Sequence, residues 1–558
     1  MLAGTVNRVA GGHGGGGAGL FTFVGALAFY LLCAEPAPSW LDSPELAAGA
    51  ASLGVAHPPG QPLALLVGKA ASLVPLGSLA LRVALASAVA GAVAASLVTL
   101  LALRLLEAIT GEAPPPALRA IAVAGGLAFA GTWAHAFQCV RVEVYALHTA
   151  LALGAGVLAV DAERSEGAAR TRALLGGALC VGLGLCNHHL GTLVCTAPLV
   201  LWLVLLRPPV HALAGMLAVG ALCAGLYAYL PLRAGTEPVN WGHPATLERF
   251  LWVVTAKAFQ KTSERGEDSA AAFELIVQMT PLAAGLSLGG AWLLARSRRC
   301  HGLAILVIGL SVAAPLSTVV VGFDPTNADR QGWTAPGLGS LWALAVLPVA
   351  LLARRYRRAA LPLAAVAVAL AVGQGARNLA ALDRHDLWAA DDVARLIWDS
   401  VPPRARVETA NHQGLFQRWY GAVAEGARPD VQSWHRHFAG QPGYPPRPWT
   451  PDLVEVEFDT GAGEGRPSGA FMSAGGDPAA AETRTRQFLE AFDAICGGSA
   501  DRETRRAALW RHFLLARLLC QPGQEVPALA RYALARARAY NGGPSAELDA
   551  LGRACGVY

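Results

Sequence analysis

Apolar residues are concentrated between residues 20 and 376 of this 558-residue chain, in runs long enough to cross a lipid bilayer. A membrane-spanning helix needs about 20 mostly apolar residues, and about eleven segments of the chain come close to that length. The pattern therefore predicts a mainly α-helical, polytopic membrane protein. The predicted spans lie near residues 20–34, 79–106, 118–137, 142–160, 173–187, 189–206, 211–231, 273–295, 303–321, 336–353 and 359–376.

The remainder of the chain is more polar and is predicted to form two further parts. Residues 377–479 mix short apolar runs, such as Val-Glu-Val near 454–456, with proline-rich turns, which indicates a small mixed α/β domain. Residues 480–558 place apolar side chains at helical spacing and predict three or four amphipathic helices. These helical hairpins resemble tetratricopeptide repeats, although their repeat signature is weak. Residues 1–19, rich in glycine, are predicted to form a flexible N-terminus.

Basic residues predict the orientation of the spans, because cytoplasmic loops retain Lys and Arg. The strongest clusters, at 296–299 and 354–358, are separated by two predicted spans and therefore lie on the same side. Counting back places the N-terminus inside, and an odd number of spans places residues 377–558 outside. We therefore expect a multi-pass protein of a bacterial inner membrane, with its C-terminal region in the periplasm and its polar loops, above all 35–78, on the external face.

Composition agrees with this organisation and excludes an ordinary soluble enzyme: 54% of residues are apolar, 15% are charged and the mean hydropathy is +0.41. The net charge of +5 is too small to suggest nucleic acid as the main partner. Most of the ten cysteines lie in apolar runs, and none forms a CxxC pair. The polar tail contains Cys496, Cys520 and Cys555, which allow at most one disulfide and one free thiol.

The first external loop carries the most suggestive polar residues. Asp42 and Glu45 lie three residues apart and share one face if the segment is helical. They are either an N-cap with its capping box or partly desolvated carboxylates, of which one acts as a base. His57 heads a rigid Pro-Pro turn, where it either binds a phosphate, donates a proton or simply bonds a turn carbonyl.

Several ordered motifs make a resemblance specific. The first loop contains DSPEL from Asp42, LGVAHPPGQPL around His57 and GKAASLVPLGS around Lys69, and VEVYALH, GLGLCNHH, YLPLR, NWGHP and RPDV follow in order. Together they resemble a bacterial membrane family of formerly unknown function, related to the eukaryotic endoplasmic-reticulum O-mannosyltransferase of plexin-type domains. The resemblance covers most of residues 20–270. Pro44 departs from it, because glycine is expected at that position of the acidic motif.

The resemblance implies a GT-C glycosyltransferase fold and an enzyme that uses a polyprenyl-phosphate sugar, with mannose favoured, as donor. The implied acceptor is an external hydroxyl, of a Ser or Thr in an envelope protein or of a glycan. Asp42 would be the general base of an inverting displacement, with Glu45 as the second catalytic carboxylate. No cofactor is firmly implied, and because no ligand cluster stands out, the sequence indicates no metal site and leaves dependence on a divalent metal open.

Cationic residues of the same region are candidates for binding the donor phosphate. Arg233 follows the seventh predicted span, where a guanidinium either grips two phosphate oxygens or snorkels to the interface. His57, Lys69 and Arg82 are the other candidates. The predicted substrate cavity is formed by Glu143, expected to pair with Arg141, together with Tyr145, Asn187, His188 and Trp241; Asp324 and Asp329 are further possible lining residues.

A second hypothesis is a non-enzymatic membrane scaffold or a lipid-handling transporter with an envelope-binding tail. A transporter is expected to place ionisable groups mid-membrane in two matching halves of broken helices, and we see no such internal repeat. The hypotheses differ in whether Asp42, His57 and Arg233 converge on one externally open cavity.

Overall fold

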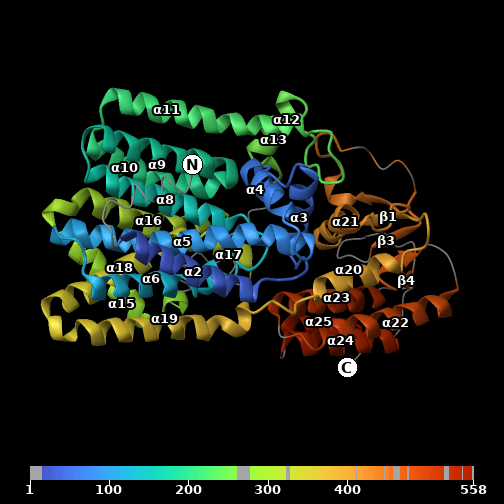
Figure 1. Ribbon diagram of the computed structural model, residues 1–558. Coiled ribbons are helices and arrows are strands. Elements are labelled where there is room, and N and C mark those ends of the chain that lie inside the picture. Colours follow the sequence, from blue (N-terminus) through green and yellow to red (C-terminus); the bar gives the residue numbers. More distant parts are fainter. Residues whose placement is uncertain are drawn as a thin grey trace.

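A computed structural model describes residues 15–259, 277–321 and 327–555, the last range with short gaps at 410, 445, 447, 449, 456–465, 474–476, 500, 521–526 and 543–544. The membrane helices form an elongated bundle, and the C-terminal region packs against one end of it (Figure 1). Helices α3 (Ser43–Ser52) and α4 (Pro62–Ser72) of the first loop lie at that end. The fold is mainly α-helical and polytopic, as the sequence predicts.

The described residues contain nine helical segments that are long and apolar enough to cross a membrane. Two further predicted spans are helices of only 15 and 16 residues, α6 (Pro116–Ala130) and α15 (Pro281–Arg296), so the count of eleven stays a prediction. The nine segments are built from α2 (Gly15–Cys33), α5 (Leu79–Thr110), α8 (Tyr145–Glu163), α9 (Gly167–Asn187), α10 (His189–Leu206), α11 (Val210–Ala224) with its continuation to Leu232, α16 (His301–Val321), α18 (Ala335–Arg355) and α19 (Ala360–Leu382).

Three predicted boundaries differ from the structure. Helix α2 begins at Gly15 rather than at residue 20, and residues 1–14 of the predicted flexible terminus lie outside the described residues. Helix α6 ends at Ala130, so the predicted span 118–137 is too long; Gly131, which follows it, packs closely against the backbone of Gly375. Helix α19 continues to Leu382, beyond the predicted domain boundary at 376.

The segment between Ala130 and Tyr145 is therefore a long connection rather than a brief turn. It contains the short helix α7 (Trp133–Ala136) and polar side chains that are buried at the end of the bundle. Among them, Arg141 is about 1% exposed, which is exceptional for a charged side chain and requires nearby partners. Apolar periodicity extends a predicted helix through such a segment because alanine and valine flank its polar residues.

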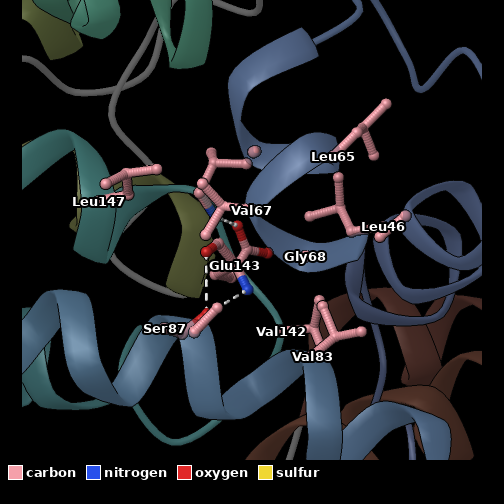
Figure 2. A pocket seen from close by; sticks show the side chains of 13 residues that line it. Leu46, Leu65, Val67, Gly68, Val83, Ser87, Val142, Glu143 and Leu147 are labelled. Carbon is pink, nitrogen blue, oxygen red and sulfur yellow. Dashed lines mark hydrogen bonds between the residues drawn. The ribbon is translucent and has the colours of Figure 1, made fainter. Parts of the chain in front are cut away.

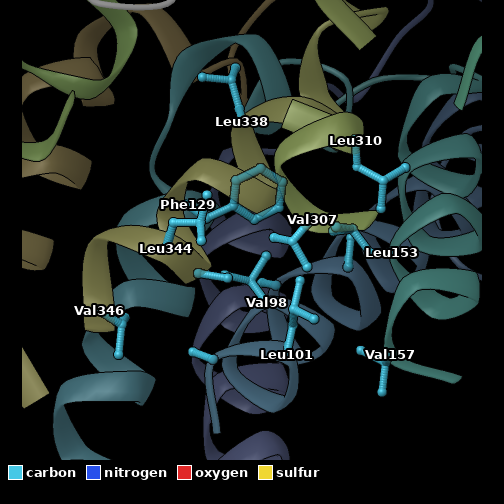
Figure 3. Packing of buried hydrophobic residues seen from close by; sticks show 14 of the residues in the cluster. Val98, Leu101, Phe129, Leu153, Val157, Val307, Leu310, Leu338, Leu344 and Val346 are labelled. Atoms are coloured by element: carbon cyan, nitrogen blue, oxygen red, sulfur yellow. The ribbon is translucent and has the colours of Figure 1, made fainter. Parts of the chain in front are cut away.

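Small and branched apolar side chains fill the interior of the bundle. Figure 3 shows side chains of α5, α6, α8, α16 and α18 meeting in one layer, with Val98 and Leu101 of α5 and Phe129 of α6 at its centre. Alanine and glycine at the contacts let the helices approach closely, which is how membrane helices associate without a hydrophobic driving force between them. Helix α15 approaches α18 in this way at Gly290.

The C-terminal region contains a small sheet followed by helices. Strands β1 (Arg406–Thr409), β2 (Gln432–His435), β3 (Leu453–Glu455), β4 (Arg466–Ser468) and β5 (Phe471–Ser473) lie in the order β2-β1-β3-β5-β4. The β1 pairings with β2 and β3 are parallel, whereas β5 pairs antiparallel with β3 and β4. The short apolar run noted near 454–456 overlaps β3. Helices α20 (Ala389–Asp399) and α21 (His412–Glu425) accompany the sheet.

Four helices complete the chain: α22 (Pro478–Cys496), α23 (Arg502–Leu519), α24 (Pro527–Asn541) and α25 (Ala546–Ala554). They confirm the predicted amphipathic helices, while their kinship to tetratricopeptide repeats and the domain boundaries stay predictions. Cys520 and Cys555 form a disulfide and Cys496 is a free, buried thiol, which matches the predicted limit of one disulfide.

A buried ion-pair cluster joins α23 to the first external loop. Arg384, which follows α19, places its Nε 3.2 Å from Glu35 Oε2 and its Nη1 2.6 Å from Asp501 Oδ1. The side chains of Arg384 and Glu35 are 2% and 0% exposed. Beside them, Trp40 Nε1 donates a hydrogen bond to Thr504 Oγ1 at 3.0 Å. The C-terminal helices are thus fixed to the loop that carries Asp42.

We expect Gly290→Ala to weaken the packing of α15 on α18, because the new Cβ would lie 2.0 Å from the carbonyl oxygen of Leu344. Overpacking of this kind costs about 1–3 kcal/mol, measured as a lower midpoint of thermal unfolding in detergent. Gly285→Ala on the same helix is the matched control, since no described atom lies within 4 Å of its Cβ position. Equal midpoints for the two variants would contradict the proposed contact.

Arg384→Met should loosen the C-terminal helices, because it leaves the carboxylate of Glu35 buried without its main partner. Removing one member of a buried pair costs about 3–5 kcal/mol, and we expect faster amide hydrogen exchange in α23 together with a lower unfolding midpoint. Arg395→Met, which removes a pair whose arginine is 51% exposed, is the control and should change stability little. Unchanged exchange in α23 would show that Arg384 does not hold this interface.

Candidate active site

Asp42 occupies the N-cap position of α3, yet its side chain makes no capping hydrogen bond. Its φ and ψ of −84° and −9° are helical, so the carboxylate does not fold back over the first amides of α3 as a capping box requires. Pro44 in the first turn has no N–H to be capped. The geometry therefore contradicts the capping interpretation of Asp42 and Glu45. Both carboxylates are available to other partners.

Glu45 binds His57 through both of its oxygens. The backbone N–H of His57 donates to Oε1 at 2.7 Å, and the ring Nδ1 lies 2.7 Å from Oε2. The side chain of Glu45 is 0% exposed, so no room is left for a substrate at either oxygen. Glu45 thus fixes the orientation of the His57 ring, and the alternative in which His57 bonds a turn carbonyl is not what the structure shows.

Asp42 approaches the other side of the same ring. Its Oδ2 lies 3.7 Å from His57 Nε2, and its side chain is 30% exposed. Gln61 also reaches Nε2 at 2.8 Å through its amide nitrogen, which leaves Gln61 Oε1 buried without a partner. With the amide nitrogen and oxygen of Gln61 exchanged, Oε1 would accept a hydrogen bond from a protonated His57 ring.

The surroundings of these side chains shift their pKa values in a direction useful for catalysis. Removal from water raises the pKa of Asp42 to about 7; the charge of His57 opposes this shift, while Asp329 and Glu45 add to it. Removal from water lowers the pKa of His57, but the carboxylates of Glu45 and Asp42 outweigh it and raise the pKa to about 10. His57 is therefore a cation at neutral pH, and Asp42 can take up a proton there.

A second set of charges lies next to Asp42, on the connection before α8 and on α17 (Ala328–Gly332). Arg141 Nη2 lies 3.3 Å from Glu143 Oε1, which confirms the predicted pairing, and also forms an ion pair with Asp329 Oδ1. From the sequence, Asp329 is only a possible lining residue of the cavity. Asp324, the other such residue, lies outside the described residues. Tertiary packing alone brings α17 to this position.

Three of the four predicted phosphate-binding cations, all except His57, donate hydrogen bonds to backbone carbonyls. Lys69 Nζ donates to the carbonyl of Ala51 at 2.6 Å, and Arg233 donates to those of Leu53 and Ser52 at 2.7 and 3.0 Å. Cations at a helix C-terminus stabilise its free carbonyls, so both side chains secure the end of α3. Arg82 likewise donates to the carbonyls of Ser72 and Ser78, at the end of α4 and the start of α5. Their contact with a donor phosphate stays a prediction.

The other predicted cavity residues are all buried: Tyr145, Asn187, His188 and Trp241. Tyr145 and His188 lie together, with ring centroids 5.2 Å apart, and Tyr145 Oη accepts a hydrogen bond from Trp333. Asn187 donates to the carbonyl of Val144, and its Oδ1 is buried without a partner. Trp241 is only 3% exposed and packs 4.5 Å from Phe438, so it does not present a free face for a sugar to stack on.

Two triads have ligand atoms within 4.8 Å of one another and are the described residues that would suit a divalent cation: Asp42, Glu45 and His57, and Asp42, Glu143 and Asp329. In the first triad, Glu45 and His57 satisfy each other and a protonated His57 has no lone pair to offer. In the second, Arg141 already neutralises part of the charge. The residues therefore have an internal explanation for their proximity, and no step is assigned to a metal.

An apolar cavity leads to Glu143 from the side of α3, α4, α5 and α8. Figure 2 shows Glu143 among the lining residues, with Leu46 and Leu65 on one side of it and Leu147 on the other. The backbone of Glu143 is fixed by Ser87, which donates to its carbonyl at 3.0 Å and accepts from its N–H at 3.2 Å. Val67 is 37% exposed, so the cavity lies near the surface of the bundle rather than in its core.

Comparison with known proteins agrees with this architecture. Residues 42–212 match the family model of the Protein O-mannosyl-transferase TMEM260 N-terminal domain. Over 222 residues the chain is 35% identical to the Protein O-mannosyl-transferase TMEM260 of Mus musculus, a match that covers 38% of this chain. The chain spans about 30% of the length of that curated relative.

Among solved structures, ArnT from Cupriavidus metallidurans bound to undecaprenyl phosphate superposes with a TM-score of 0.53 at 14% identity, covering 74% of this chain and 89% of that one. The apo state of ArnT gives a TM-score of 0.51 at 13% identity, with 74% and 88% covered. The resemblance that the sequence motifs indicate is therefore confirmed: residues 42–212 match the model of the protein O-mannosyl-transferase TMEM260 N-terminal domain, and 74% of the chain shares the fold of ArnT.

Proposed function

We propose that the protein is a membrane glycosyltransferase that moves a sugar, with mannose favoured, from a polyprenyl-phosphate carrier to an acceptor hydroxyl. The observation that carries the proposal is the state of Asp42: it is a partly exposed carboxylate, with no side-chain hydrogen bond among the described residues, beside the half-buried cation of His57. The mouse relative is a protein O-mannosyl-transferase, and the ArnT structure contains undecaprenyl phosphate, which supports both the reaction and the carrier.

In the proposed reaction, Asp42 is the general base. It accepts the proton of the acceptor hydroxyl while that oxygen attacks the anomeric carbon and the bond from this carbon to the phosphate oxygen breaks. The polyprenyl phosphate leaves with the bonding electrons, and a single displacement inverts the anomeric configuration. Because an alcohol is a very weak acid and a phosphate leaves readily, the base is needed on the acceptor side.

The neighbours of Asp42 then have distinct roles. His57 is a cation within 3.7 Å of the base and would stabilise the negative charge that develops on the leaving phosphate. Among the described residues, both carboxylate oxygens of Glu45 hydrogen-bond to His57, so we propose that it is a positioning residue rather than a second base. Lys69, Arg82 and Arg233 hold the ends of α3 and α4, and so fix the loop that presents Asp42.

We propose that the first isoprene units of the carrier pack on the apolar side chains of α3, α4 and α5 around the cavity beside Glu143, rather than inside it, because its volume of about 30 Å³ has room for a few waters only. A lipid chain on this surface would bring its phosphate toward the cluster that contains Asp42. Burial of apolar surface favours the binding of an isoprenyl chain, so apolar side chains suit it better than a polar groove does.

The acceptor is proposed to be a Ser or Thr hydroxyl of an envelope protein, or a glycan, on the periplasmic side of a bacterial inner membrane. Helix α21 packs against α3, so the C-terminal region borders the entrance to the site and is placed to receive an acceptor. The disulfide between Cys520 and Cys555 supports an oxidising compartment for this region, because such bonds are rare where thiols are kept reduced.

Asp42→Asn should abolish transfer while leaving the fold intact, because it keeps the shape of the side chain and removes its basicity. Loss of a general base lowers the rate by about 10²–10⁴-fold. We would compare envelope glycopeptides by mass spectrometry in a deletion strain complemented with wild-type protein or with the variant. Only the wild type is expected to restore the modification.

Asp386→Asn is the matched control, since that carboxylate is 84% exposed outside the site. Expression level and unfolding midpoint of both variants should equal those of the wild type. Full restoration by Asp42→Asn would exclude Asp42 as the base. No change of glycosylation between the deletion and wild-type strains would instead favour the scaffold or transporter hypothesis.

The pH profile provides an independent check. Because Asp42 must be deprotonated and its pKa is raised to about 7, kcat/KM should fall as the pH decreases through this value. In His57→Gln the opposing positive charge is lost, so the pKa of Asp42 rises further and the acidic limb moves to higher pH. An acidic limb near pH 4 in the wild type, or no movement in the variant, would contradict the assignment.

A further inference from the structure

A polar cavity lies on the other side of α17 from the candidate active site. It is lined by Trp133, Gln278, Gln331, Arg377, Asn378 and Arg502, with Val277 at its edge. Its volume of about 140 Å³ is roughly ten times the 10–15 Å³ that a single water needs, so it can hold a larger polar group. Residues of the membrane bundle and of α23 contribute to the same wall.

Two arginines that have no counterion among the described residues line the cavity. Neither Arg377 nor Arg502 forms an ion pair or a side-chain hydrogen bond within the described part of the chain. Of the two acidic neighbours of Arg502 in sequence, Asp501 is bound to Arg384 and to Thr504, and Glu503 is buried and forms no ion pair with Arg502 among the described residues. Two guanidinium groups facing one cavity repel each other, and an anion placed between them would relieve this repulsion.

The neutral wall of the cavity is rigid. Gln278 accepts a hydrogen bond from the N–H of Ala134 at 3.1 Å and donates to Gln331 Oε1 at 3.3 Å, while its own carbonyl accepts from Gln374 at 2.7 Å. Asn378 donates to the carbonyl of Gly131 at 2.8 Å. These side chains are therefore held in place before any ligand arrives, which reduces the entropy lost on binding.

The position of the cavity along α19 indicates how a ligand would reach it. Arg377 is exposed one to two turns from the end of this membrane helix, and Leu370 and Val366, seven and eleven residues before it and so on the same face, are 54% and 56% exposed. Apolar side chains exposed on a spanning helix face acyl chains, so Arg377 lies where the apolar layer meets the headgroups. Arg502 adds a second cation from the C-terminal region.

We propose that this cavity binds the phosphate group of an anionic phospholipid, with the acyl chains lying along α19. Guanidinium groups bind phosphate oxygens through paired, charge-assisted hydrogen bonds, and basic pockets at a membrane surface retain anionic headgroups. The lipid would join Arg377 of the bundle to Arg502 of the C-terminal region. This binding does not depend on the proposed glycosyl transfer.

The test measures lipid retention by the full-length protein. Purified protein in detergent is titrated with phosphatidylglycerol, and bound lipid is counted by native mass spectrometry. The wild type should retain one tightly bound lipid, and the double variant Arg377→Ala with Arg502→Ala should bind it roughly tenfold more weakly. Arg553→Ala, which removes an exposed arginine of α25, is the control and should bind as the wild type does.

Parallel titrations distinguish the sources of the phosphate. Phosphatidylcholine, which has no net charge, should be retained more weakly, and inorganic phosphate at the same concentration should not displace the bound phosphatidylglycerol. Displacement by inorganic phosphate would identify a soluble anion and overturn the lipid assignment. Equal retention by the wild type and by a double variant with a normal unfolding midpoint would overturn the site itself, and Arg502→Lys, which keeps the charge, should retain most of the binding.

Discussion

Two buried guanidinium groups on the ring of Phe137 hold together the end of the bundle that carries Asp42. The guanidinium carbons of Arg141 and Arg384 each lie 4.9 Å from the centroid of this ring. Arg141 binds Glu143 and Asp329, and Arg384 binds Glu35 and Asp501. Because a buried charge is tolerated only when it is paired, each of these six charged side chains depends on the correct position of the others.

This arrangement connects segments that are far apart in the sequence. The connection before α8, the helix α17, the first external loop and the start of α23 meet at the two arginines. The carboxylates around Arg141 also affect Asp42, since Asp329 adds to the raised pKa of Asp42 while Arg141 opposes it. The charge network thus sets both the geometry of the end of the bundle and the basicity of the residue proposed to act on the acceptor.

The first loop shows why charged residues with similar sequence contexts have different roles. Asp42 and Glu45 are three residues apart, yet one is partly exposed and the other is sealed under His57. Lys69 and Arg233 looked alike as phosphate ligands, because a cation after an apolar run is compatible with either a headgroup or a helix end. The structure shows both at the C-terminus of α3, where free carbonyls compete for them.

The sequence by itself determined the membrane helices, the amphipathic C-terminal helices and the limit of one disulfide in the tail, because apolar length, helical periodicity and cysteine count are properties of the sequence alone. It also predicted the pairing of Glu143 with Arg141, which are two residues apart. Only the tertiary structure decided that Asp329 joins this pair, that Arg384 ties the tail to the bundle and that Gly131 packs closely against Gly375. These outcomes depend on contacts between residues separated by up to several hundred positions, and such contacts follow from the packing of whole helices rather than from any local pattern.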